Sequence, residues 1–178
     1  RGRTAGGSSA CGSAWEDERK FGGKRIGSSV LSFLQGKLNQ AVAKDPRFAL
    51  AYAGLADAHN QISFFNLQRP RDVMPKAKDA ATRALEIDPA LAEAHISLGW
   101  ASFTYDWDWP AATRHFEQAR MLNAVVVDNH PSFQFYLTVA GRPDDAIGVG
   151  RQAFERNPVS ASLSHTLGVQ LALAGRYD

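Results

Sequence analysis

One pattern of small and apolar residues occurs four times along this chain, always with offsets of +4, +3 and +5. The first three members of each set fall on one stripe of a helix. The fourth lies just beyond the helix end and is proline in three of the four sets, and proline cannot continue the hydrogen-bond ladder. The sets are Leu34, Leu38, Ala41, Pro46; Ala77, Ala81, Ala84, Pro89; Ala112, Phe116, Ala119, Ala124; and Ala146, Gly150, Ala153, Pro158.

A second pattern marks the segment before three of these stripes and occurs once more near the end of the chain. Its large apolar members Leu55, Leu98, Phe133 and Leu167 lie 43, 35 and 34 residues apart, and the helix-ending places 46, 89, 124 and 158 give the same three intervals. Two landmarks that shift together indicate a true repeat. Each repeat is expected to be a pair of helices, and a lone pair would leave its apolar face wet, so the pairs must stack.

The fold class follows from what separates the periodic segments. From about residue 30, Ala- and Leu-rich segments of about 12 to 15 residues are broken by Asp-Pro, Asn-Pro and Gly-Arg, and none has the alternation of a strand. Hydrophobic residues at 44% and charged residues at 21% are ordinary for a globular protein. We therefore predict an all-α protein. Residues 1–27 are Gly- and Ser-rich and are expected to be a flexible arm or sequence added for expression.

Over residues 30–178 the chain resembles the tetratricopeptide repeat (TPR) family, in particular in the turn Ala140-Gly141-Arg142-Pro143-Asp144-Asp145-Ala146. The resemblance implies a right-handed α-α superhelix of antiparallel helix pairs over residues 28–178, which acts by binding a partner. The expected units are 28–48 (partial), 49–91, 92–126, 127–160 and 161–178 (partial). Because the fifth unit stops where its second helix is due, we expect a piece of a longer protein, with self-association through this incomplete unit as a further possibility.

The units depart from the family pattern in three places. Unit 49–91 has nine extra residues, expected between Ile62 and Met74, and the next unit has one extra residue within 105–109. Gln134 stands where a small residue is expected. Gly148 and Gly150 each weaken their helix by up to about 1 kcal/mol relative to Ala, so the fourth unit is expected to be the least stable.

The phrases at residues 51–57 and 105–109 are also similar to TPR regions of bacterial winged-helix regulators, adenylate cyclases and protein kinases. This narrower resemblance gives an alternative function, that of a regulatory or sensor tail for an effector domain.

Stacked pairs of this kind form a concave surface lined by the first helix of each pair. Helical spacing places eleven candidate partner-binding residues there: Asp57, Asn60, Gln61, Ile96, Trp100, Phe103, Thr104, Phe135, Thr138, His165 and Val169. The lining is apolar in its middle, with Trp100 and Phe135 as candidate anchors, so an apolar or amphipathic protein or peptide is the expected partner. The alternative is that Trp100 and Phe103 only pack against neighbouring helices. No Lys or Arg converges there, which argues against binding of an acidic carboxyl-terminal tail.

The segment Asp106-Trp107-Asp108-Trp109-Pro110 has two interpretations. Two exposed Trp would make it a recognition loop. The interpretation that we favour makes Asp108 an N-cap with Pro110 in the first helical turn, and both Trp rings pack between units.

Other functions are disfavoured. Cys11 is the only cysteine, and no two of the five histidines have the spacing of a local ligand pair, so we expect no metal and no cofactor. No nucleophile, phosphate-loop or dinucleotide motif is present, so we expect no enzyme. Residues 1–28 have a net charge of +3 and the remainder −1, which offers nucleic acid no strong attraction. With no apolar run long enough for a bilayer, we expect a cytoplasmic protein.

Overall fold

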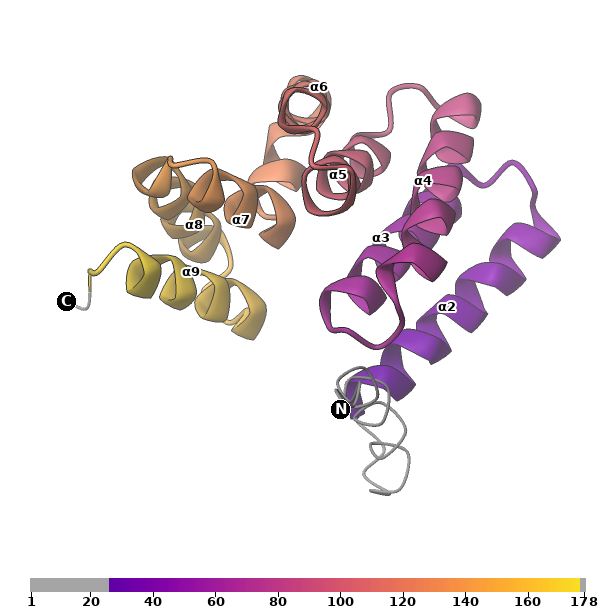
Figure 1. The fold of residues 1–178 in the computed structure, drawn as a ribbon, viewed down its shortest axis with the longest axis horizontal. Coiled ribbons are helices and arrows are strands. Elements are labelled where there is room, and N and C mark those ends of the chain that lie inside the picture. Colours follow the sequence, from indigo (N-terminus) through magenta and orange to yellow (C-terminus); the bar gives the residue numbers. More distant parts are fainter. Residues whose placement is uncertain (1–25, 177–178) are drawn as a thin grey trace, which may run out of the picture.

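The computed structural model describes residues 26–176 as an arc of stacked helices (Figure 1). Within this range all regular structure is helical, so the all-α prediction is confirmed. None of these helices is long and apolar enough to cross a bilayer. The arm expected over residues 1–27 lies outside the described residues up to residue 25. The helices are α2 (Ile26–Lys44), α3 (Ala49–Phe64), α4 (Pro70–Ile87), α5 (Ala92–Ala101), η1 (Ser102–Asp106), α6 (Trp109–Asp128), α7 (Pro131–Val139), α8 (Pro143–Arg156) and α9 (Ala161–Leu173).

The helices are arranged in pairs that stack along the arc. Helices α3 and α4, α5 and α6, and α7 and α8 pack as pairs, and the first helices α3, α5, α7 and α9 each contact the next one. Helix α2 packs on α3 at one end of the arc, and α9 packs on α7 and α8 at the other (Figure 1). This is the predicted α-α solenoid.

Each pair ends at a residue with extended backbone dihedrals. Asp88 (φ −136°, ψ 96°) and Asn157 (φ −143°, ψ 75°) precede proline, and a residue before proline is pushed out of the helical region. Asn123 adopts nearly the same dihedrals (φ −155°, ψ 87°) although Ala124 follows it. The Asn123 side chain replaces the proline's effect, because its Oδ1 accepts a hydrogen bond from the backbone N–H of Val126 at 3.2 Å and so caps the following turn.

The extra residue of the third unit forms a turn of π-helix. We expected it within residues 105–109, and the structure takes it up in η1, which begins three residues earlier. A π-turn accommodates one added residue without moving the helices on either side. It ends at Trp107, whose backbone is in the left-handed region (φ 58°). The backbone N–H of Asp108 then donates to the Ser102 carbonyl at 2.9 Å.

The nine extra residues of the second unit lengthen both of its helices. Helices α3 and α4 have 16 and 18 residues, whereas α7 and α8 of the fourth unit have 9 and 14. The added length places Phe64 at the end of α3, one turn beyond the core residue Asn60.

Where the two helices of a pair approach most closely, a large residue on one helix faces a glycine on the other. Gly99 on α5 faces Phe116 on α6, whose ring atoms lie 3.1 Å from where a glycine Cβ would be. In the fourth unit the positions are reversed. The larger residue, Gln134, is on the first helix α7, and the glycine, Gly150, is on the second helix α8. Close packing explains this arrangement, because the space between the two helices has room for only one large residue.

Gln134 is accommodated by a buried polar network. Its side chain is fully buried, and its Nε2 donates to the Asp128 carbonyl at 2.6 Å while its Oε1 accepts from Gln170 Nε2 at 2.9 Å. A Cβ on Gly150 would lie 2.6 Å from Gln170 Oε1. A methyl group at position 150 would therefore force the Gln170 side chain to move, in addition to changing the helix propensity.

The two glycines of α8 thus provide a matched test. Gly148 has open space around a Cβ, so Gly148→Ala is expected to raise the free energy of unfolding by up to about 1 kcal/mol through helix propensity. Gly150→Ala is expected to lower it by about 1 to 3 kcal/mol, because the added methyl overpacks the glutamine network. Urea unfolding followed by circular dichroism measures both. Equal effects of the two substitutions would contradict this account.

His95 of α5 and His115 of α6 face each other across one pair, with their Nδ1 atoms 3.2 Å apart. Burial lowers the pKa of both imidazoles, and the charge of His95 lowers the pKa of His115 further. One neutral ring can donate to the other, whereas two protonated rings would repel.

Acid is therefore expected to loosen this pair. A histidine with a lowered pKa in the folded state stabilises the fold above its unfolded pKa of about 6.5, and this stabilisation is lost as the pH falls below that value. His115→Gln is expected to flatten the decline in unfolding free energy between pH 7 and pH 5. Urea unfolding series at both pH values measure the slope, and an unchanged slope would show that the pair does not couple folding to protons.

Candidate functional site

A groove of about 340 Å³ lies on the concave side of the arc, bordered by the first helices α3, α5, α7 and α9. Helices α3, α7 and α9 each contribute a stripe of residues at three- and four-residue spacing, and α5 contributes Trp100. They are Asp57, Asn60, Gln61, Phe64, Phe65, Trp100, Pro131, Ser132, Phe135, Ser162, His165, Thr166 and Val169.

One part of the groove is aromatic. Trp100 is only 6% exposed, and its ring packs against Phe64 at 5.4 Å and against Phe135 at 5.8 Å between centroids. Phe64 also meets the Phe135 ring edge-on at 6.1 Å and remains 49% exposed. Such edge-to-face contacts hold rings in fixed positions. The aromatic cluster is therefore anchored by Trp100 and presents Phe64 to solvent.

Another part of the groove is polar and carries a carboxylate. Asp57 Oδ1 lies 3.8 Å from His130 Nε2. Burial raises the pKa of Asp57, and burial lowers the pKa of His130, each opposed by the attraction between the two. Asn60, one turn further along α3, donates its Nδ2 to the Ser97 carbonyl at 3.1 Å.

Pro131 determines how α7 enters the groove. The residue before a proline is pushed toward extended dihedrals, and His130 adopts φ −86° and ψ 124°. The His130 Nδ1 accepts from the backbone N–H of Ser132 at 3.3 Å, so the ring serves as the N-cap of α7. This break starts α7 at the groove and places Pro131 and Ser132 in its lining.

The structure brings seven of the eleven predicted residues into the groove: Asp57, Asn60, Gln61, Trp100, Phe135, His165 and Val169. Ile96 and Phe103 do not line it, because α5 is packed by neighbours on several sides and both residues are buried in the core. Thr104 and Thr138 do not line it either, and each donates its hydroxyl to a carbonyl of its own segment, those of Trp100 and Gln134. A binding role for the seven stays a prediction.

Sequence reasoning missed part of the lining. Phe64 and Phe65 come from the insertion in the second unit, which the repeat pattern could locate but not orient. Pro131, Ser132, Ser162 and Thr166 were also not predicted. Pro131 was a usable signal for this part of the lining, because a proline in the sequence of a first helix changes where that helix begins.

The segment 106–110 leads into α6, and its two Trp residues differ in exposure. Asp108 Oδ1 accepts from the Ala111 backbone N–H at 2.9 Å, so the predicted N-cap is confirmed. Trp109 packs against Phe103 at 5.7 Å and against Tyr136 of the next unit at 6.1 Å, as expected. The same expectation is wrong for Trp107, which is 73% exposed because its left-handed backbone turns the side chain away from the core.

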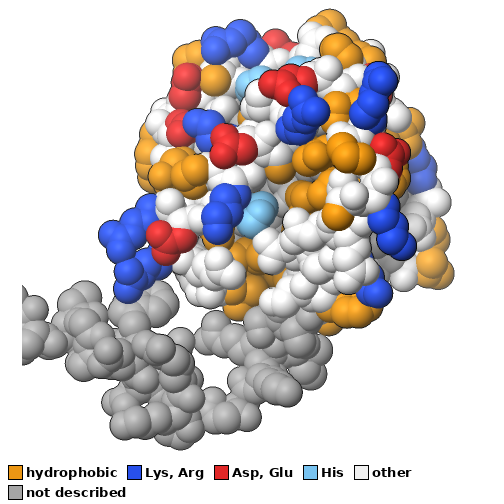
Figure 2. Space-filling view, turned by 90° about the vertical axis from the view of Figure 1, so that its right-hand side faces the viewer, with side chains coloured by type: hydrophobic (Ala, Val, Ile, Leu, Met, Phe, Trp, Pro, Cys, Tyr) orange, Lys and Arg blue, Asp and Glu red, His pale blue; other side chains and the backbone are white. Residues whose placement is uncertain are grey.

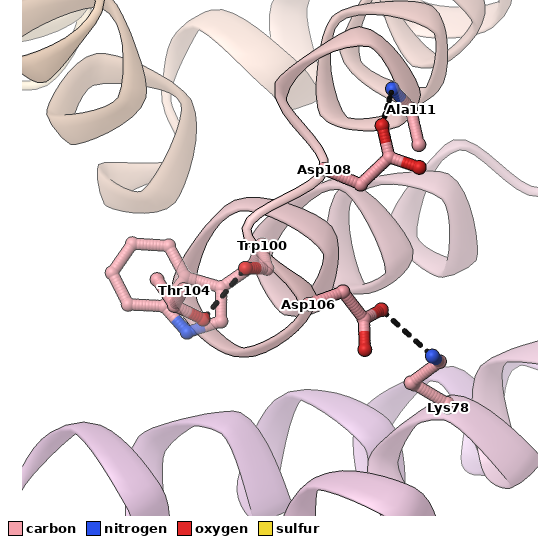
Figure 3. A network of polar contacts seen from close by, with 6 residues as sticks. All are labelled: Lys78, Trp100, Thr104, Asp106, Asp108 and Ala111. Atoms are coloured by element: carbon pink, nitrogen blue, oxygen red, sulfur yellow. Dashed lines mark hydrogen bonds and ion pairs between the residues drawn. The ribbon is translucent and has the colours of Figure 1, made fainter.

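One contact joins this segment to α4, and a second lies within the helix that precedes it. Lys78 Nζ on α4 donates to Asp106 Oδ2 at 2.7 Å, and the Thr104 hydroxyl donates to the Trp100 carbonyl at 2.7 Å (Figure 3). The ion pair links the second unit to the third, while the threonine bond caps a carbonyl next to η1.

The charges on the face at the α2 and α4 end of the arc are mixed. Figure 2 shows Lys and Arg side chains interspersed with Asp, Glu and apolar ones over this face. No area of one sign dominates there. Within residues 26–176, no three His, Cys, Asp or Glu residues lie close enough together to hold a metal ion.

Comparison with solved structures gives the fold. The chain is similar to TTC0263, described as a thermophilic TPR protein in Thermus thermophilus, with a TM-score of 0.62 and 18% identity over 83% of this chain and 76% of that one. It is also similar to MamA, with a TM-score of 0.50 and 19% identity over 88% of this chain and 80% of that one. Comparisons with family models and with curated proteins gave no match.

At this level of identity the likeness establishes the fold, and the chain therefore has the TPR fold. The comparisons give no support to the narrower resemblance to TPR regions of regulators, cyclases and kinases.

Trp107 also provides a test of the backbone at this helix start. A left-handed conformation costs a non-glycine residue about 1 to 2 kcal/mol, and Asn tolerates it better than most. Trp107→Gly is expected to raise the free energy of unfolding by about 1 kcal/mol. Asn66→Gly, at a similar φ of 53°, is the matched control and is expected to change it less. Thermal unfolding compares the two, and a larger effect at Asn66 would contradict the argument.

Proposed function

We propose that this chain is a non-catalytic TPR scaffold that binds a peptide segment of another protein in its concave groove. The observation that carries the proposal is the groove itself, in which four first helices converge on an aromatic cluster that presents Phe64 to solvent beside polar groups. Ligand pockets commonly have this composition, with an apolar and aromatic lining and a few polar groups that orient the ligand.

The groove is suited to binding because it is already formed. Trp100 is held by Phe64, Phe103 and Phe135, so little side-chain freedom remains to be lost when a ligand packs against the cluster. Preformed surfaces bind more tightly than flexible ones for the same contact area. Aromatic residues are also the usual centres of binding energy.

The proposal of a non-catalytic role rests on the side chains that surround the groove. A serine or threonine hydroxyl becomes an effective nucleophile when it is hydrogen-bonded to a base such as histidine. Among the hydrogen bonds of residues 26–176, no Ser or Cys side chain is paired with a histidine ring. The groove's serines and threonine, Ser132, Ser162 and Thr166, therefore serve as polar contacts for a ligand.

Self-association through the C-terminal residues 161–178 stays a prediction. Helix α9 leaves Leu173 exposed at the end of the arc. The expected cytoplasmic location also stays a prediction.

A peptide selection tests the proposed function. Random 12-residue peptides displayed on phage are selected on the immobilised chain, and the enriched peptides are measured by fluorescence anisotropy. Peptides with aliphatic or aromatic residues are expected to be enriched. Phe135→Ala is expected to weaken their binding by roughly tenfold or more, as loss of a central aromatic contact does.

Phe33→Ala is the control, because Phe33 is an exposed ring of α2 that does not line the groove. It is expected to leave the affinity unchanged, and circular dichroism checks that both variants are folded. Peptides that bind both variants as tightly as the original chain would show that the groove is not the binding site.

A further inference from the structure

We propose that the groove selects peptide segments in which a basic side chain, Lys or Arg, stands next to an apolar one. This inference rests on the proposed function and names the class of partner for the same site. The apolar side chain packs on Phe64 and Phe135, and the basic side chain reaches Asp57.

Charge complementarity is the first argument. Asp57 is the one carboxylate among the residues that line the groove, and the lining contains no Lys or Arg. Its side chain is 41% exposed, so the carboxylate is accessible from the groove. A carboxylate at the edge of an apolar surface, with low-dielectric surroundings, attracts a cation more strongly than it would in water.

The second argument is that Asp57 has no cationic partner within the described residues. The nearest basic group is His130, 3.8 Å away, and burial lowers its pKa and so favours the neutral ring near pH 7. Gln61, on the next turn of α3, favours the ionised carboxylate and so lowers the pKa of Asp57, but it is a neutral side chain and supplies no cation. Burial raises the pKa of Asp57, and a ligand cation would reverse this shift by favouring the ionised carboxylate.

The spacing of the two parts decides what kind of ligand fits. Asp57 and Phe64 are seven residues apart on α3, which corresponds to about 10 Å along the helix. The long stem of Lys or Arg packs along apolar surface while its charged end reaches a polar site. A basic residue close in sequence to an aliphatic or aromatic residue therefore spans the groove, whereas an acidic segment would meet Asp57 with like charge.

Three probes of equal length and different charge test this inference on the full chain. They are 4-phenylbutylammonium, 4-phenylbutan-1-ol and 4-phenylbutyrate, titrated at pH 7 and followed by nitrogen-15 NMR signals of the Trp100 indole and of residues 57–65. The cation is expected to bind at least about fivefold more tightly than the alcohol, as a charge-assisted contact would give. The carboxylate probe is expected to bind most weakly.

Asp57→Asn keeps the shape of the side chain and removes its charge. It is expected to bring the affinities of the ammonium and the alcohol to within about twofold of each other while the affinity for the alcohol stays the same. Asp72→Asn, an exposed carboxylate of α4 outside the groove, is the control and is expected to keep the preference for the cation.

The outcomes separate this inference from the proposed function. If the alcohol binds as tightly as the ammonium, or if the preference for the cation survives in Asp57→Asn, selection of a basic side chain by Asp57 is wrong, while the apolar groove stands. If none of the three probes shifts the groove signals, both the inference and the proposed binding groove are wrong.

Discussion

The close approach of the paired helices is the constraint on which the rest of the structure depends. Each pair can hold one large residue at its crossing, and the partner helix must then offer a small one, as Gly99 does for Phe116 and Gly150 does for Gln134. This reciprocity follows from packing at crystal-like density, where a methyl group without space forces the helices apart. Because each first helix also packs on the next one, a change at one crossing is passed to the concave surface that the first helices form.

Departures from the repeat, more than the repeat itself, shape the groove. The insertion in the second unit extends α3 until Phe64 meets Trp100 and Phe135. The proline in the fourth unit shortens α7 and brings His130 within 3.8 Å of Asp57. The regular stripes of small and apolar residues set the distances between the helices. A binding surface differs from one solenoid to another because such local irregularities add side chains at places that the regular repeat leaves open.

The chemistry of the groove depends on desolvation. His130 and Asp57 are close enough to attract each other, yet burial opposes the charged form of both. A carboxylate in such a place interacts more strongly with a charge on a ligand than a carboxylate in open water does, because solvent screens the interaction less. The neighbouring aromatic cluster excludes water in the same way. In the proposed binding mode, the apolar and the charged parts of the groove strengthen each other's selectivity for a ligand.

The sequence by itself determined the helical pairs. Small and apolar residues recur at helical spacing in the stripes at 34–41, 77–84, 112–119 and 146–153, and Asp-Pro or Asn-Pro ends most of these helices. It also indicated the Asp108 cap, and helical periodicity together with the family resemblance indicated seven of the thirteen residues that line the groove. Only the tertiary structure decided that Ile96 and Phe103 lie in the core, that Trp107 is exposed while Trp109 is packed, and that Phe64 lines the groove. The reason is physical. Periodicity gives the direction of a side chain around its own helix, whereas burial depends on which other helices lie in that direction, and that is settled by packing between units.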